Sequence, residues 1–271
     1  MTEEQPDDYA EMIDTNITQV FAEFIPRKID FEPNIKTLIS GFPGAGLVGS
    51  IASRHIAYEL EMDVIGYIRS PLIPPQATFF DGYLTYPLRI YSKKDFDIAV
   101  LVSEAPISER AHFYIANAVL SWLEDIKAQE LIILDAYSST SDNNDTFLIA
   151  EPDLWKKGKK IEKIKAALPE EKDLGTGYIG GVGGAILNES IINKNIDAFA
   201  LLAPVQNTRI PSPRSSAKLI SMLNEYKNLT IDTNKLIEHA NRIERSLSQF
   251  ARKQEEMQMR DQTRQETGLY Y

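Results

Sequence analysis

Residues on which many enzymes and metal sites depend are absent or scarce in this chain. None of the 271 residues is cysteine, which excludes disulfides, a thiolate nucleophile and a cysteine-ligated zinc or iron–sulfur centre. The three histidines, His55, His112 and His239, form no metal-binding spacing such as H-E-x-x-H. No G-x-S-x-G nucleophile elbow occurs either. We therefore expect no bound metal and no catalytic site built from these residue types.

Long apolar runs and an excess of positive charge are also lacking. No run approaches the roughly 18 apolar residues of a membrane span, so we expect no contact with a membrane. The net charge is −10 and the pI is near 4.9, which argues against nucleic acid as the main partner. The basic cluster Lys156–Lys160 is interpreted as a solvated helix face. The acidic N-terminus has no signal-peptide pattern, and with the absence of cysteine this favours a cytoplasmic protein.

The remaining pattern is an alternation of short apolar runs with helical periodicity. This alternation predicts an α/β fold, in which helices cover both faces of a mostly parallel sheet in a three-layer α/β/α sandwich. A flexible acidic arm is expected at 1–16, and one domain at 17–228. The expected strands are 37–40, 64–68, 83–91, 97–103, 130–135 and 198–203, and the expected helices are 47–61, 109–127, 160–167 and 213–226, with Ser108 as a helix N-cap.

The pattern changes near the C-terminus, where a long helix is expected over 229–265. Apolar residues recur there in alternating four- and three-residue steps between charged faces, which is typical of a coiled-coil seam. We expect this helix to leave the body of the protein and to carry a flexible tail at 266–271. The seam consists of Leu236, Ala240, Ile243, Leu247 and Phe250.

A glycine-rich loop lies between the first expected strand and the first expected helix. Gly44, Gly46 and Gly49 satisfy G-x-G-x-x-G, the fingerprint of a dinucleotide site, whereas Leu47-Val48 replaces the Lys-Ser/Thr of a P-loop that begins at Gly41. A nucleotide- or nucleoside-binding α/β enzyme is therefore an alternative function. The other interpretation is that these glycines allow a tight turn and close packing of helix against strand.

Two further features bear on this enzyme alternative. A second glycine cluster at 175–184 contains no acid, base or nucleophile, and either lines a ligand cleft or packs as an irregular loop before a helix at Ala185; its Gly177, Gly180 and Gly181 are the residues of interest. Asp135 ends an expected strand, and Glu104 follows another. Such carboxylates serve either as a catalytic pair or as simple caps of turns and helices.

The chain ends on Leu269, Tyr270 and Tyr271 after a charged, helix-like stretch and Gly268. A terminal carboxylate with adjacent apolar and aromatic side chains is suited to capture in a pocket of another protein. The pattern resembles the hydrophobic–Tyr–any-residue (HbYX) tail with which proteasome activators and assembly factors dock on the proteasome core particle.

Several sequence blocks resemble the archaeal branch of the proteasome assembly chaperone family, whose eukaryotic relatives are the second-type assembly chaperones. The resemblance covers about residues 35–225, and the first and last of its blocks are the most specific. It implies an α/β/α sandwich similar to that of nucleoside phosphorylases. The blocks are GFPGAGLVGSIASRHI from 41, PPQATFFDGYLTYPLRIY from 74, DIAVLVSEAPI from 97, ELIILDAYSS from 130 and GTGYIGGVGGAIL from 175.

The resemblance also implies a function. Some archaeal members end in the HbYX tail and act on the proteasome without ATP, and the family offers no catalytic residue or cofactor to assign here. It implies binding to the α-ring of the proteasome core particle through Leu269, Tyr270 and Tyr271, as an activator or an assembly factor. A homo-oligomer is the expected assembly, and unfolded proteins are a further class of partner consistent with this function.

Overall fold

The computed structural model describes residues 21–80, 82–139, 145–156, 162, 175–238 and 240–241. Their main feature is an eight-stranded sheet with the order β1-β3-β6-β7-β2-β8-β10-β9. Four central strands, β7, β2, β8 and β10, run parallel, and the remaining neighbours pair antiparallel. Because β3 also points the same way, five of the eight strands share one direction. The expected mostly parallel sheet is confirmed.

The strands of this sheet are short at its edges and longer at its centre. The two strands β4 (Thr78–Phe80) and β5 (Tyr83–Thr85) form a separate hairpin. The strands of the main sheet are β1 (Glu23–Pro26), β2 (Thr37–Gly41), β3 (Asp63–Arg69), β6 (Leu88–Ser92), β7 (Ile98–Ser103), β8 (Glu130–Ser138), β9 (Phe147–Ala150) and β10 (Asp197–Val205).

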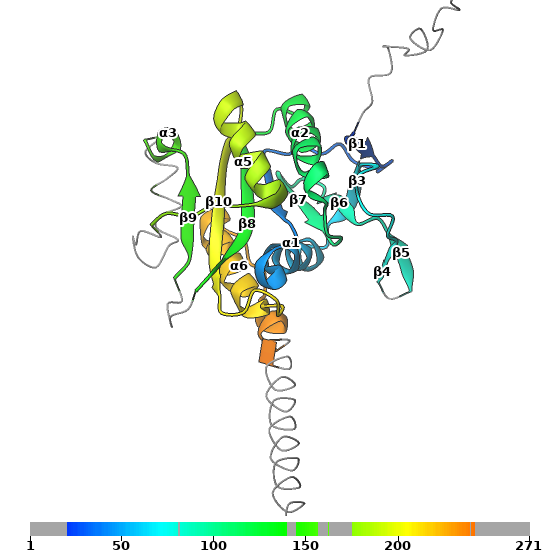
Figure 1. The fold of residues 1–271 in the computed structure, drawn as a ribbon. Helices are drawn as coiled ribbons and strands as arrows, with labels where there is room; N and C mark the ends of the chain where they lie inside the picture. Colours follow the sequence, from blue (N-terminus) through cyan, green and yellow to red (C-terminus); the bar gives the residue numbers. More distant parts are fainter. Residues whose placement is uncertain are drawn as a thin grey trace, which may run out of the picture.

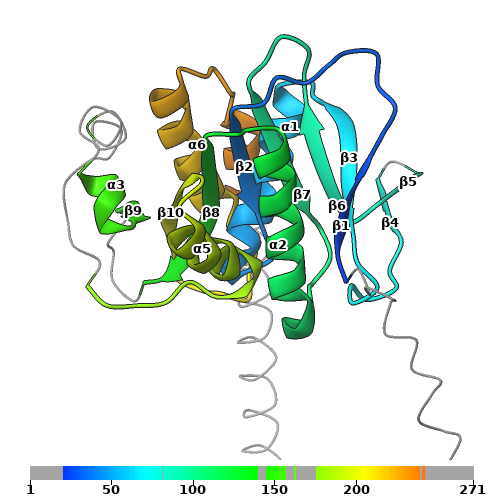
Figure 2. The same cartoon turned by 90° about the horizontal axis from the view of Figure 1, so that it is seen from above.

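Helices cover both faces of the sheet, which makes the fold a three-layer α/β/α sandwich (Figures 1 and 2). One face carries α1 (Val48–Glu59), preceded by the short helix η1 (Ala45–Leu47), together with α6 (Pro213–Lys227). The other face carries α2 (Glu109–Asp125) and α5 (Gly181–Asn193). A four-residue helix, α3 (Pro152–Trp155), follows β9. None of the helices that the structure describes is both long and apolar enough to cross a bilayer.

The central strands have mostly apolar sequences because both of their faces are covered. Every residue of β2 and β7 is buried. Alternate side chains of these strands enter two separate cores: Ile39 and Val100 pack beneath α1 and α6, whereas Leu38 and Leu101 pack beneath α2 and α5. This is the burial expected for parallel strands between two helical layers.

Some local expectations are corrected. The run 83–91 is not one strand, because Pro87 interrupts it: β5 pairs with β4, and only β6 pairs antiparallel with β7. Ser108 occupies the N-cap position of α2 as expected, but its hydroxyl donates to the Leu72 carbonyl oxygen (3.1 Å) and makes no capping hydrogen bond. Helix α5 begins at Gly181, one turn before Ala185. The helix expected at 160–167 lies outside the described residues except for residue 162, and the arm at 1–16 lies outside them entirely.

A buried polar cluster ties the end of α6 to the amino ends of two central strands. The Glu130 carboxylate is 3% exposed and forms an ion pair with Lys227. It also accepts hydrogen bonds from the Tyr226 hydroxyl and from Thr37 Oγ1 (3.3 Å). Burial and the adjacent Glu130 charge raise the pKa of Tyr226, which keeps its hydroxyl protonated as a donor. The cluster compensates a buried charge with several partners, as stability requires.

Replacing Tyr226 with Phe should lower the free energy of unfolding by about 1.5–3 kcal/mol, because a hydrogen bond to a buried carboxylate is lost. The exposed Tyr58 provides the control, since Tyr58→Phe should change stability by less than about 0.5 kcal/mol. Urea unfolding measures both. Equal midpoints for the two variants would show that the Tyr226–Glu130 bond contributes nothing to stability.

Candidate functional site

The first glycine loop lies at the point where the topology places ligand sites in open α/β sheets. After β2 the chain continues into η1 and α1 on one face of the sheet, whereas after its parallel neighbour β7 it continues into α2 on the opposite face. The carboxyl ends of these adjacent parallel strands therefore form a topological switch point. Gly41, Gly44, Gly46 and Gly49 all lie there, as the nucleotide alternative requires.

Most of these glycines are needed for close backbone packing. A Cβ atom on Gly41 would lie 1.9 Å from the carbonyl oxygen of Gly49, and one on Gly49 would lie 2.3 Å from the carbonyl oxygen of Leu134. Gly46 has a φ of +59° and faces Val205. Helix α1 thus lies directly on the backbones of β2 and β8. A Cβ atom on Gly44 would meet no close backbone: the nearest backbone atom, the Phe42 carbonyl oxygen, would lie 3.9 Å away, and the Asp135 Oδ1 atom 3.1 Å away.

Two amide groups of this loop are already used within the chain. The Gly46 N–H donates to the Thr208 carbonyl oxygen (2.8 Å), and the Leu47 N–H donates to the Gly44 carbonyl oxygen (3.0 Å). A dinucleotide loop needs such amides free to bind a pyrophosphate at a helix N-terminus. Leu47, in the left-handed conformation, also separates η1 from α1. This geometry favours packing over phosphate binding as the role of the first glycine loop.

The second glycine cluster differs from the first. Cβ atoms on Gly177, Gly180 and Gly181 would have no atom within 4 Å, so close packing does not explain these residues. Tyr178, between them, is 97% exposed. The cluster approaches the first loop at Gly183. A Cβ atom there would lie 3.0 Å from the Ile133 side chain and 4.0 Å from the side chain of Phe42, which belongs to the first loop. The two glycine segments are therefore neighbours, and the second one leaves an open surface at the start of α5.

Asp135 is the carboxylate that the structure places between these elements. Its Oδ1 accepts a hydrogen bond from the Ala136 N–H (2.8 Å) and lies against Gly44. Burial disfavours the charged form and raises the pKa of Asp135 to about 6, although the Ala136 hydrogen bond lowers it in part. A carboxylate of this kind is a candidate for a functional group.

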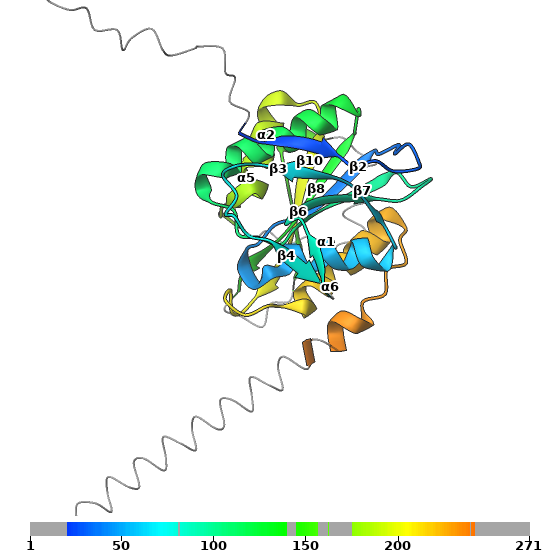
Figure 3. The same cartoon turned by 90° about the vertical axis from the view of Figure 1, so that its right-hand side faces the viewer.

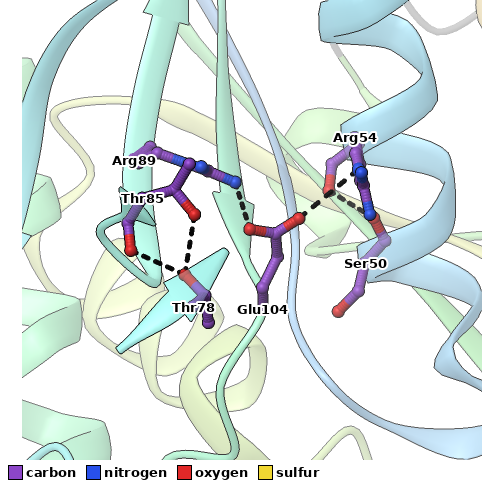
Figure 4. Close-up of polar contacts among 7 residues, drawn as sticks. Ser50, Arg54, Thr78, Thr85, Arg89 and Glu104 are labelled. Carbon is purple, nitrogen blue, oxygen red and sulfur yellow. Dashed lines mark hydrogen bonds and ion pairs between the residues drawn. The ribbon is translucent and has the colours of Figure 1, made fainter. Parts of the chain in front are cut away.

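Glu104 does not form the expected pair with Asp135. Its carboxylate instead binds the buried Arg89 of β6 and lies 3.5 Å from the half-exposed Arg54 of α1 (Figure 4). Burial raises the pKa of Glu104, and the two arginines partly offset this. The cluster therefore joins β6, α1 and the end of β7, beside the Thr78–Thr85 hydrogen bond of the hairpin. Structural support, rather than acid–base catalysis, is the role consistent with this geometry.

The start of the C-terminal helix is fixed to α1. The His55 ring nitrogen Nε2 and the Asp232 carbonyl oxygen are 2.6 Å apart, and Lys235 forms an ion pair with Glu59 (2.7 Å). The Asn224 side chain bonds both the N–H and the C=O of Ile231, which holds the turn after α6. The chain therefore enters its C-terminal helix from a defined point on the α1–α6 face, which Figure 3 shows at the base of the body.

The first two positions of the expected seam are buried in the single chain. Leu236 is 7% exposed and packs in the core beneath α1 and α6, and Ala240 is 2% exposed. Ile243, Leu247 and Phe250 lie outside the described residues, as do Leu269, Tyr270 and Tyr271. The proposed tail site is therefore not placed by the structure. Among the residues that it does describe, no group of acidic or histidine side chains could hold a metal ion.

Sequence reasoning missed the hairpin and the two arginines around Glu104. Asp81-Gly82, between two apolar runs, is a typical hairpin turn and could have predicted β4 and β5. No local pattern could have identified Arg54 and Arg89 as partners of Glu104, because they come from a helix and a strand that meet only in the folded chain.

The fold and the first glycine loop define the class of protein. It is an α/β/α sandwich in which glycines allow a helix to pack closely on the parallel strands of a central sheet. The PAC2 family model matches residues 38–251, and the chain belongs to the PAC2 family. The resemblance to archaeal proteasome assembly chaperones is thereby confirmed.

Individual relatives agree with this assignment. The chain is 32% identical to an uncharacterized protein of Methanocaldococcus jannaschii over 90% of its own length and 95% of that protein. It is similar to the crystal structure of Pyrococcus furiosus PbaA, an archaeal homolog of proteasome-assembly chaperone, with 26% identity, a TM-score of 0.74, and coverage of 92% and 99% of the two chains. Pyrococcus furiosus PbaB, an archaeal proteasome activator, shares the fold with 20% identity, a TM-score of 0.69, and coverage of 86% and 99%.

A Gly41→Ala substitution tests the packing role of the first glycine loop. Because the new Cβ would overlap the Gly49 carbonyl oxygen, we expect a loss of about 3 kcal/mol or more in the free energy of unfolding. Gly177→Ala is the matched control in open space and should change it by less than about 1 kcal/mol. Chemical denaturation measures both. An equal effect of the two substitutions would contradict the packing role.

Asp135→Asn tests the buried carboxylate. A folded-state pKa of about 6, above the ordinary 3.8, means that the folded protein holds the proton more tightly, so stability falls as the pH rises from about 4 to 6 and then levels off. The free energy of unfolding of the variant, relative to that of the wild type, should therefore increase by ~2 kcal/mol from pH 4 to pH 7. Denaturation at both values measures this gain. A difference independent of pH would contradict the raised pKa.

Proposed function

We propose that this PAC2-family protein docks its C-terminal HbYX tail into the α-ring of the proteasome core particle and acts without ATP as an activator, an assembly factor or both. The observation that carries the proposal is the coexistence of two independent features in one chain. One is the match to a family with proteasome-related members, and the other is the terminal Leu269-Tyr270-Tyr271.

The attachment of the C-terminal helix supports the proposal. Asp232 and Lys235 are held by His55 and Glu59 of α1, so the chain that leads to the tail starts from a fixed position. The roughly 28 residues between Asn241 and Leu269 would span about 40 Å if they were helical. A tail on such a connection reaches well beyond the body that carries it.

The chemistry of the three terminal residues defines their roles in the proposed pocket. Leu269 fills an apolar niche between neighbouring α-subunits. The Tyr270 ring packs on the pocket wall while its hydroxyl makes a hydrogen bond. The terminal carboxylate of Tyr271 pairs with a lysine. One such contact is weak, but several tails on a homo-oligomer raise the avidity by roughly 10²–10⁴.

Gate opening in this proposal requires no nucleotide. A tail that binds the open α-ring more tightly than the closed one shifts the equilibrium by that difference in affinity alone. The protein then acts in the cytoplasm as a binding partner and not as an enzyme. Unfolded proteins are the substrates that an opened ring would receive.

Peptide hydrolysis by the cognate core particle, measured without ATP, tests the proposal. The intact protein should stimulate hydrolysis, and deletion of Leu269–Tyr271 should abolish the stimulation. Tyr270→Ala should weaken binding more than about tenfold, as loss of a central tyrosine does at interfaces. Tyr271→Ala should be milder, because the terminal carboxylate remains.

The control is Tyr178→Ala, which removes an exposed tyrosine from the second glycine cluster and should leave stimulation unchanged. If core-particle binding and hydrolysis are the same with and without Leu269–Tyr271, the tail is not the docking element and the proposal is wrong.

A further inference from the structure

The β4–β5 hairpin stands apart from the main sheet and exposes an apolar face. Figures 1 and 2 show it to one side of the body, beyond β3 and β6. Phe79 and Leu84 are directly opposite each other in the pairing, so they share one face of the hairpin. Their exposed fractions are 71% and 80%. Thr78 and Thr85 pair on the other face, are half-buried, and bond each other (2.8 Å).

An isolated two-stranded hairpin is marginally stable in water, and three or more strands or a packing partner are needed to stabilise it. This hairpin belongs to a sheet of its own and pairs with no further strand among the residues that the structure describes. Adjacent exposed apolar side chains on such an element mark a surface that contacts another molecule.

A groove elsewhere on the chain, lined by aromatic and polar side chains, offers a site for Phe79 and Leu84. It lies between β1 and α2, and its cavity volume is about 430 Å³. Two aromatic pairs line it: Phe21 with Tyr114, at 4.4 Å between ring centroids, and Phe24 with Trp122, at 4.9 Å. A cavity of about 150 Å³ holds one benzene molecule, so this groove has room for the Phe79 ring and the Leu84 side chain together.

The N-terminal segment of the chain, which leads into the groove at Phe21, is the alternative candidate to occupy it. The charges of the two segments favour the hairpin. The groove lining includes the acids Asp125 and Glu23, of which Glu23 forms an ion pair with Arg69 outside the lining. Residues 1–20 contain six acids and no base, so they would place like charges together. Residues 78–85 contain a single charged residue, and the Phe79–Leu84 face has none. The Phe79–Leu84 face therefore brings no like charge to the groove and also fits it by size.

We propose that the hairpin of one copy of this protein docks into the β1–α2 groove of a second copy, with Phe79 and Leu84 against the groove's aromatic side chains. Since the two surfaces are different, the contact is heterologous and propagates from copy to copy until a ring closes. The inference deepens the proposed function, because it supplies the oligomer that would present several tails.

The absence of cysteine allows the contact to be tested directly by thiol cross-linking in the full-length protein. One variant carries Leu84→Cys in the hairpin, and a second carries Ser121→Cys at an exposed position of the groove. The two proteins are allowed to exchange subunits and are then treated with a short bifunctional maleimide. A third variant, Ile13→Cys with Ser121→Cys, reports on the N-terminal segment.

A cross-link between L84C and S121C chains, with little product from either variant alone, is the expected result. Cross-linking of L84C to itself would indicate a symmetric hairpin–hairpin contact and overturn the proposal. An intramolecular product from the double variant, with no L84C–S121C product, would assign the groove to the N-terminal segment and also overturn it. Absence of every product would do the same.

Light scattering supplies a second measurement. Phe79→Ser should lower the oligomer mass with little change in Tm, because the side chain is exposed in the single chain. Ile192→Ser, at 73% exposure on α5, is the matched control and should leave the mass unchanged. Deletion of Leu269–Tyr271 should not affect the cross-link or the mass. Failure of the tail proposal and failure of the hairpin proposal are therefore distinguishable.

Discussion

The close approach of α1 to the central sheet is the constraint on which the rest of the structure depends. It exists because Gly41 and Gly49 have no side chains, so that the helix backbone lies on β2 and on the Leu134 carbonyl oxygen of β8. Any larger residue would push α1 outward. The position of α1 in turn sets that of Arg54, which lies beside Glu104, and of His55 and Glu59, which hold the start of the C-terminal helix. The close packing of α1 on β2 and β8 therefore fixes the start of the C-terminal helix.

Two groups of polar contacts support this arrangement at the carboxyl end of α6. At the amino ends of β2 and β8, buried Glu130 binds Tyr226 and Lys227 and so fixes the last turn of α6. Beyond that turn, Asn224 bonds both backbone groups of Ile231. The short connection after α6 is consequently held at both ends, and the C-terminal helix begins from a rigid platform. Such a platform suits a protein that presents its C-terminus to a partner, because it reduces the conformational freedom lost on binding.

Much of the fold could be predicted from sequence, because its strongest signals are local. The apolar run at 130–135 and the periodicity at 109–127 gave β8 and α2, and the alternation of strands with helices gave the layers. The edge strands β1 and β9 are four residues long and were missed. The role of the glycines could not be decided from their spacing, because G-x-G-x-x-G suits either phosphate binding or close packing. The close backbone contacts at Gly41 and Gly49, and the hydrogen bond from the Gly46 amide to Thr208, distinguish the two. Likewise, Leu236 fits a coiled-coil seam in sequence and packs in the core of its own domain in the structure.

The central claim is that several tails act together from one body. The most direct test compares two affinities for the cognate core particle: that of the full-length protein and that of a synthetic peptide ending in Leu269-Tyr270-Tyr271. Multivalent docking predicts that the protein binds at least about 100-fold more tightly than the peptide. The difference should disappear when the three residues are deleted from the protein. Equal affinities of the intact protein and the peptide would contradict multivalent docking, and undiminished binding of the truncated protein would contradict docking through the tail.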